Sequence, residues 1–405
     1  MPTEKALVLD SQGQNSLALS RSLGRKGISV TAGGNARFLP GMLSKYTDGS
    51  YVHPDVATDK HAFVEHLRTH LADNEYDAVF AVTDLLTTVL AEHKTELERT
   101  GTKVGTEDWE TFLAANDKGR LFDRMEDTDV PTPETHTPST IDEVAAIDDE
   151  RDYDVVVKPR RTTVIDGQGE ATTNRIVGSN YLPQEENLAE RYREILDESP
   201  SLRMQWPLVQ EYIDGVEAKC TVGLADEGEL LSVFQHKKHR VYPPSGGIGA
   251  VRQGTREPRM RENAARVVEE LGWTGPVHVE FVMTPDGEFH LIEVNGRYWG
   301  SLALTINSGV DIPWMHYHQL RGDRPSKRID GYRTDVFQRK LFYHDILWLR
   351  ENLEAGRTRA LVPFLTSFAT TREELLDPTD PLPTLGLIPR SLNVLIDRRR
   401  DASVY

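Results

Sequence analysis

The sequence predicts a mixed α/β and α+β fold, in which an N-terminal domain with a parallel sheet is followed by antiparallel sheets. Strand-like apolar runs alternate with helical segments over residues 1–115, and this alternation is typical of parallel sheets with crossover helices. Further along, the strand-like runs 277–283 and 289–294 are joined by Pro285-Asp286-Gly287. That turn is typical of a hairpin and predicts antiparallel pairing.

The N-terminal elements follow one another as short units. An apolar run at 6–9 predicts the first strand, and the turn cluster 10–13 after it lacks the three-glycine fingerprint of a dinucleotide site. A turn that binds no ligand is therefore favoured there over an NAD site. The other predicted elements are a helix at 15–26, a strand at 28–32, a helix at 60–74 and a strand at 77–82.

Beyond residue 115 the pattern of strands and helices becomes mixed, and it ends in a helical tail. Helices are expected at 116–125, 185–197 and 260–271, and strands at 154–158, 208–213, 219–224 and 229–235. We expect a Rossmann-like domain over 1–115, mixed α/β segments over 116–207 and 208–330, and a helical extension over 331–405. In the extension, an apolar face predicts a helix that packs on the core or on a second subunit: Phe337, Leu341, Phe342, Ile346 and Leu349.

The chain carries 47 basic and 64 acidic residues, which gives a formal net charge of −17. An acidic surface disfavours nucleic acid and anionic membranes as partners, because both attract basic proteins. No apolar run long enough for a membrane span and no signal peptide is found, and the single cysteine, Cys220, fits a reducing compartment. A cytoplasmic location is therefore expected. The 13 lysines among so many acids favour a halophilic source over an ordinary acidic protein.

The hairpin carries the most informative polar residues. Glu280 lies on its first strand, and Glu293 and Asn295 lie on the second. Residues two apart leave the same face of a strand, so Glu293 and Asn295 project together. Two carboxylates and an amide oxygen are hard ligands suited to Mg²⁺. The alternative interpretation is a solvated face of an antiparallel sheet.

Two more segments are candidates for nucleotide binding. Lys158 ends an apolar strand and precedes the polar loop Asp166-Gly167-Gln168-Gly169, where a lysine and backbone N–H groups can reach phosphate oxygens. Glu211 and Glu217 flank an acidic turn. Backbone groups beside Glu211 could bind an adenine edge, and Glu217 could accept hydrogen bonds from both ribose hydroxyls. A surface hairpin in the first case, and a solvated strand end in the second, are the competing interpretations.

The order of these motifs resembles the ATP-grasp superfamily over residues 1–320. The series runs from Lys118 through Val157-Lys158-Pro159, Gln210-Glu211-Tyr212-Ile213 and Glu280 to Glu293-Val294-Asn295-Gly296-Arg297. The last motif is most similar to the carbamoyl-phosphate-synthase-like and predicted carboxylate–amine ligase branch. Gly296 departs from the proline that this family often has there, and the loop after Lys158 is less glycine-rich than usual.

The resemblance implies a small lobe over 116–207, a large lobe with the Mg²⁺–ATP site over 208–330, and a role for each residue. Lys118 and Lys158 would hold the phosphates of ATP, and Gln210, Glu211, Tyr212 and Ile213 would form the adenine hinge. Glu217 would bind the ribose, whereas Glu280, Glu293 and Asn295 would bind Mg²⁺, or Mn²⁺ in its place. Arg297 would face the reacting carboxyl phosphate.

A basic cluster between the hinge and the hairpin is a local exception in this acidic chain. Residues 236–240 read His-Lys-Lys-His-Arg, and a glycine-containing loop at 243–249 and Arg252 follow. We predict that Arg240 helps to bind an anionic substrate or the transferred phosphoryl group. A solvated strand end with a tight loop is the alternative.

Three other groups receive weaker assignments. Residues 298–301 are expected to line a substrate pocket, and Lys219 to face the nucleotide. His278 and Cys220 are expected to be core residues rather than ligands.

The resemblance implies an ATP-dependent ligase that joins a carboxylate to an amine through an acylphosphate and releases ADP and phosphate. Its partners would be a small-molecule carboxylate and an amine, and a homodimer is left open. A phosphotransferase and a non-catalytic nucleotide-binding regulator are the alternative functions.

Overall fold

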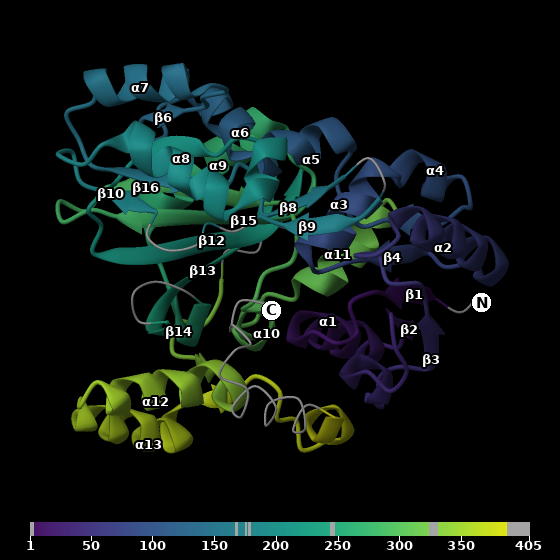
Figure 1. Cartoon of the computed structure of the whole chain (residues 1–405). Helices are drawn as coiled ribbons and strands as arrows, with labels where there is room; N and C mark the ends of the chain where they lie inside the picture. The colour runs from purple at the N-terminus through teal and green to yellow at the C-terminus, as the bar shows by residue number, and fades with distance from the viewer. Residues whose placement is uncertain are drawn as a thin grey trace.

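The computed structural model describes residues 4–166, 169–174, 176, 180–243, 248–323 and 331–386, and the side chains of Ile248, Phe342 and Tyr343 are left undescribed within these ranges. Gly167 and Gln168 of the predicted phosphate loop, and residues 244–247 of the second glycine loop, lie outside the described part. Figure 1 shows α7 (Ile141–Glu150) at one end of the molecule and α12 (Ile346–Glu354) and α13 (Leu361–Thr370) at the other.

The N-terminal domain is built on a five-stranded parallel sheet of order β3-β2-β1-β4-β5, as the alternating pattern predicted. Asp59 caps the second helix and Thr83 the third, and each accepts a hydrogen bond from a backbone N–H of the first turn. The strands are β1 (Lys5–Val8), β2 (Ser29–Gly34), β3 (Gly49–Val52), β4 (Ala78–Phe80) and β5 (Lys103–Val104), and the helices are α1 (Gln14–Arg25), α2 (Lys60–Asn74), α3 (Asp84–Glu92), α4 (Lys94–Glu98) and α5 (Trp109–Asn116).

A smaller antiparallel sheet has the order β10-β7-β11-β6 and packs two helices through a core of its own. The strand pairing places β11 in this sheet, opposite β7, so the chain changes sheets after Glu211. The elements here are α6 (Lys118–Met125), β6 (Thr135–His136), α7 (Ile141–Glu150), β7 (Val155–Lys158), β8 (Thr163–Ile165), β9 (Ala171–Thr173), β10 (Tyr181–Leu182), α8 (Leu188–Glu198) and β11 (Leu208–Glu211).

The largest sheet has seven strands in the order β16-β15-β12-β13-β14-β17-β18. The predicted hairpin is present, and Gly287 adopts a φ of 85° in its turn, a left-handed conformation that favours glycine. One face of the hairpin packs against α9 in a continuous apolar core. The elements are β12 (Glu217–Asp226), β13 (Glu229–Tyr242), β14 (Ile248–Thr255), α9 (Pro258–Leu271), β15 (Gly275–Met283), β16 (Phe289–Asn295), β17 (Phe337–Arg339) and β18 (Arg372–Glu373).

A second core joins the N-terminal domain to the large sheet. It combines residues of β1, β2 and β4 with residues of β12 and β13 and of two helices, α10 (Leu302–Asn307) and α11 (Ile312–Leu320). The N-terminal domain is therefore held against the sheet that carries the acidic hairpin.

The C-terminal segment differs from the predicted helix at its start. Phe337 lies in β17, which pairs with β14 at Gln253, because the outer edge of β14 offers backbone groups that this strand satisfies. Helical structure begins only with a π-turn at Leu341–Asp345, followed by α12 (Ile346–Glu354) and α13 (Leu361–Thr370). None of the helices in the described ranges has the length and apolar character needed to cross a membrane.

Candidate functional site

The acidic hairpin brings its polar residues to one face of the large sheet. Glu280 pairs directly with Glu293, and His278 pairs with Asn295, so all four side chains share a face. Asn295 Nδ2 donates to Glu293 Oε1 over 2.9 Å. The alternate residues, such as Val279 and Phe281, are fully buried against α9 on the other face. The structure thus brings together Glu280, Glu293 and Asn295.

Each carboxylate of this pair is bound by a lysine. Lys118 Nζ lies 3.2 Å from Glu293 Oε2, and Lys238 Nζ donates to Glu280 Oε1 over 2.8 Å. Burial alone would raise the pKa of Glu293, but the charge of Lys118 and the hydrogen bond from Asn295 hold that pKa well below its ordinary value. Glu293 is therefore held in its ionised form, and each of the two acids binds a lysine ammonium.

Lys118 is positioned by the start of its helix. Asp117 accepts hydrogen bonds from the N–H groups of Gly119 and Arg120 and thereby caps α6. Arg160 of the small lobe donates to the same Asp117 carboxylate over 2.8 Å. This cap fixes the first residue of α6, Lys118, between the small lobe and the hairpin.

Lys158 reaches the same region from the end of β7. Its Nζ donates to Gln210 Oε1 over 2.7 Å, and Gln210 Nε2 donates to Thr135 Oγ1 over 2.8 Å. Burial and the nearby charge of Lys118 lower the pKa of Lys158 to about 8, against the opposing effect of Glu293 and Glu280. Lys118, Lys158 and the acidic pair thus lie within electrostatic range of one another.

The predicted hinge runs along the edge between the two sheets. The N–H of Glu211 donates to the carbonyl of Glu134, and the N–H of Tyr212 donates to the carbonyl of Asp154. The Tyr212 side chain is 43% exposed, and its ring makes an edge contact with that of Tyr181. Ile213 directly follows Tyr212 in the short segment that leads to β12.

Glu217 begins β12 beside a small ion-pair group. Lys219 Nζ lies 3.3 Å from Glu217 Oε2 and 2.7 Å from Glu257 Oε1. Lys219 therefore forms ion pairs with both Glu217 and Glu257.

Arg297 connects the acidic face to the N-terminal domain. Its Nη2 donates to Asp84 Oδ2 over 3.0 Å and to Asn295 Oδ1 over 3.2 Å, and its Nε donates to Asp84 Oδ1. Asp84 is the first residue of α3, and three residues separate it from the end of β4. The guanidinium thus spans from the hairpin to the end of a parallel strand.

The turn after β1 supports this contact. Asp10 is buried, and its carboxylate accepts hydrogen bonds from the N–H groups of Val82 and Thr83 and from the Thr83 hydroxyl. Burial raises the pKa of Asp10. β1 and β4 are neighbours in the sheet, at the point where the strand order reverses, and carboxyl ends of strands at such a point commonly bind ligands.

The structure does not bring Arg240 to the acidic face. The pairing of β13 with β14 shifts between Lys238 and Arg240, and the extra residue, His239, turns Arg240 to the side opposite Lys238. Arg240 Nε lies 3.1 Å from Asp345 Oδ1, and its guanidinium lies over the Trp348 ring. Its described contacts are with the C-terminal segment.

Other cations occupy the place that sequence reasoning gave to Arg240. Lys238 pairs in register with Arg252, and Arg252 Nη1 donates to the carbonyl of Gly300 over 2.8 Å. Lys340 Nζ also lies close to Gly300, and it is 3.8 Å from Glu374 Oε2. Burial lowers the pKa of Lys340 to about 8. Lys340 follows β17 in a segment without a motif, so no sequence signal pointed to it.

The donor set fits a hard divalent cation. Glu280 and Glu293 offer carboxylate oxygens from directly opposed positions, and Asn295 offers an amide oxygen on the same face. Mg²⁺ prefers oxygen ligands of this kind. Each carboxylate already pairs with a lysine ammonium in the structure, so its charge and position also suit a bound cation.

The fold has the ATP-grasp architecture: two sheets that meet at a hinge, a group of lysines and carboxylates at their junction and an N-terminal parallel-sheet domain. Residues 203–339 match the family described as "ATP-grasp in the biosynthetic pathway with Ter operon". No curated protein matches the chain by sequence.

Solved structures share this fold at low sequence identity. The biotin carboxylase domain of Hydrogenobacter thermophilus 2-oxoglutarate carboxylase, in complex with MgADP, ADP and bicarbonate, is 19% identical with a TM-score of 0.64, over 83% of this chain and 74% of that one. Biotin carboxylase from Campylobacter jejuni is 15% identical with a TM-score of 0.66, over 82% and 74%. The L-amino acid ligase from Bacillus licheniformis is 17% identical with a TM-score of 0.58, over 82% and 78%. At these identities the likeness concerns the fold.

Proposed function

We propose that the protein is an ATP-dependent ligase that joins a carboxylate to an amine and releases ADP and phosphate. The observation that carries the proposal is the opposed pair Glu280 and Glu293, surrounded by lysines from three elements. Lys118 comes from α6, Lys158 from β7 and Lys238 from β13. A site with two acids and three lysines suits a metal–triphosphate complex, in which both charges need neutralising.

In this proposal the two lobes share the nucleotide. Lys118 and Lys158 bind phosphate oxygens, and Gln210 holds the Lys158 ammonium in place by its hydrogen bond. Glu211, Tyr212 and Ile213 line the adenine, and Glu217 accepts hydrogen bonds from the ribose. Solved structures of this fold contain ADP or its magnesium salt, which supports ATP as the substrate here.

Glu280, Glu293 and Asn295 would hold Mg²⁺, or Mn²⁺ in its place. The bound ion would neutralise charge on the phosphate oxygens. On nucleotide binding, Lys118 would exchange Glu293 for a phosphate oxygen, since the phosphates and the carboxylate compete for the same ammonium.

The reaction would proceed in two displacements. An oxygen of the substrate carboxylate attacks the γ-phosphorus, the bond to the β–γ bridging oxygen breaks, and ADP leaves. The amine nitrogen then attacks the acyl carbon of the acylphosphate, the bond to the phosphate oxygen breaks, and the amine gives up a proton. Arg297 stabilises the charge on the transferring group, and Lys238 and Arg252 provide further positive charge. Exclusion of water by the lobes would protect the acylphosphate.

The test combines the full-length protein, ATP and Mg²⁺ with pooled carboxylates and amines. The likeness to an L-amino acid ligase makes amino acids the first pool. We expect ADP and phosphate in amounts that depend on both substrates, and no turnover with Glu293→Gln. AMP and pyrophosphate as products would refute this mechanism. A stable phosphorylated product formed without an amine would establish the phosphotransferase alternative instead.

A further inference from the structure

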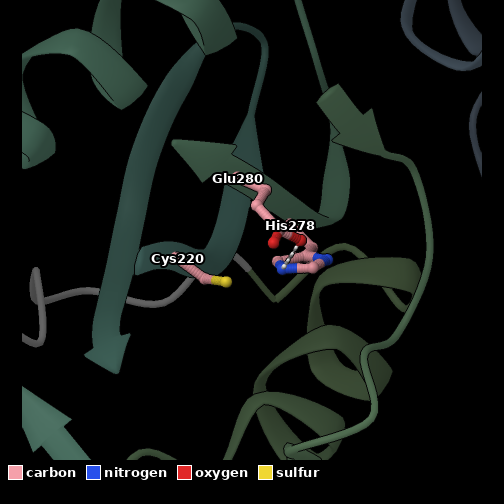
Figure 2. Close-up of side chains that lie close together, drawn as sticks. All are labelled: Cys220, His278 and Glu280. Atoms are coloured by element: carbon pink, nitrogen blue, oxygen red, sulfur yellow. Dashed lines mark ion pairs between the residues drawn. The ribbon is translucent and has the colours of Figure 1, made fainter. Parts of the chain in front are cut away.

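A second set of metal-binding atoms lies beside the acidic pair and includes the only cysteine of the chain. Cys220 on β12 pairs in register with Glu280 on β15, and His278 lies two residues before Glu280. The three side chains therefore leave the sheet on one face. Figure 2 shows them converging from the two neighbouring strands. One sulfur, one imidazole nitrogen and one carboxylate oxygen lie within 4.8 Å of one another.

The individual atoms are well disposed for a shared ligand. Glu280 Oε1 is occupied by Lys238, but Oε2 lies 4.0 Å from His278 Nε2. His278 Nε2 is buried and has no hydrogen-bond partner among the described residues. The Cys220 residue is 1% exposed. A buried imidazole nitrogen without a partner is costly, and a ligand between the three groups would satisfy it.

We propose that Cys220, His278 and Glu280 bind a thiophilic divalent cation, with Zn²⁺ and Cd²⁺ as the class of ligand. Sulfur, imidazole and carboxylate donors form the mixed set that Zn²⁺ accepts, with a water as the fourth ligand. A thiolate and a carboxylate would balance the charge of the ion, and one thiol proton would be released to solvent for each ion bound. Tetrahedral coordination places ligand atoms roughly 3.5 Å apart, so the three side chains need to close by about 1 Å.

The two metal sites exclude each other in this proposal because both use Glu280. Cys220 and His278 provide soft and intermediate donors that Mg²⁺ does not favour, whereas Glu293 and Asn295 provide hard ones. A thiophilic ion would draw Glu280 away from the Mg²⁺ set. The consequence is a direct competition between Mg²⁺ and Zn²⁺ or Cd²⁺ that does not depend on which reaction the protein catalyses.

The experiment is a titration of the metal-free, full-length protein with Cd²⁺ in the absence of nucleotide. Because the chain has a single cysteine, the ultraviolet charge-transfer band of a Cd²⁺–thiolate bond reports on Cys220 alone. We expect one Cd²⁺ per chain and a band that Mg²⁺ suppresses by competition. His278→Gln and Glu280→Gln should each raise the Kd for Cd²⁺ at least tenfold, whereas His290→Gln, a histidine on the same hairpin, should leave it unchanged.

Two results would overturn the proposal: no band at saturating Cd²⁺, or a band whose affinity is insensitive to both His278→Gln and Glu280→Gln. Cys220→Ser is the matched variant for calorimetry with Zn²⁺, where the affinity should fall at least tenfold. Circular dichroism of each variant checks that the fold is retained. Since no ATP is present, failure of this titration is distinguishable from failure of the proposed ligase activity.

Discussion

The placement of Arg240 makes a quantitative prediction about stability rather than catalysis. Its guanidinium shares the Asp345 carboxylate with Arg339, and the side chains of Asp345, Arg339 and Arg240 are 0%, 2% and 8% exposed. Removing one partner from a buried ion pair costs about 3–5 kcal/mol. Arg240→Met leaves Asp345 paired with Arg339, so we expect the free energy of unfolding to fall by an amount near the lower limit, about 3 kcal/mol. Asp345→Asn leaves two buried arginines without their carboxylate partner, and we expect the free energy of unfolding to fall by about 5 kcal/mol.

The assay combines urea unfolding with ATP turnover measured per folded molecule. For Arg240→Met we expect a lower free energy of unfolding and a turnover within about twofold of the wild type, since the β-bulge at His239 turns this side chain from the acidic face. Arg359→Met, a change at an exposed arginine of the same segment, is the control for general effects of charge. A variant of Arg240 with normal stability and strongly reduced turnover would refute the structural role and restore the catalytic one.

Three further predictions concern the site. Because the pKa of Lys158 is about 8, its phosphate-binding charge is lost as pH rises: the KM for ATP should increase about tenfold between pH 7 and 9, and Lys158→Arg should remove this dependence in a pH series. Asp84→Asn releases Arg297 from its ion pair and should lower kcat about tenfold with an unchanged Kd for ATP. An equal loss of kcat and of affinity for ATP would contradict the positioning role. Lys340 lies close to Gly300, in the segment 298–301 that is expected to line the substrate pocket. Lys340→Met should therefore raise the KM for the carboxylate substrate about tenfold but not that for ATP, and Lys103→Met, a change at an exposed lysine, is the control.

Much of the fold could be predicted because its signals are local. The N-terminal alternation of strand and helix and the hairpin around Gly287 depend on periodicity and on one left-handed turn, and the observed elements agree to within a few residues. The order of motifs predicted the superfamily for the same reason. Glu280 and Glu293 could be paired in advance because a hairpin turn sets the register of its strands.

The remaining features depend on contacts between distant segments. Phe337 was expected in a helix, but it lies in a strand because the edge of β14 offers hydrogen bonds that periodicity cannot reveal. The bulge at His239 decides which basic residue of the cluster reaches the acidic face, and one extra residue in a strand leaves no mark in the sequence. Lys340 is likewise positioned only by the pairing of β17 with β14.

The central claim, that the opposed acids and their lysines form a Mg²⁺–ATP site, is tested most directly by calorimetric titration of ATP with and without Mg²⁺. For the wild type we expect binding at one site per chain that tightens when Mg²⁺ is present. For Glu293→Gln we expect ATP binding to remain through Lys118 and Lys158, while the Mg²⁺ enhancement disappears. Absence of ATP binding by the folded wild type, or an undiminished Mg²⁺ effect in Glu293→Gln, would contradict the account.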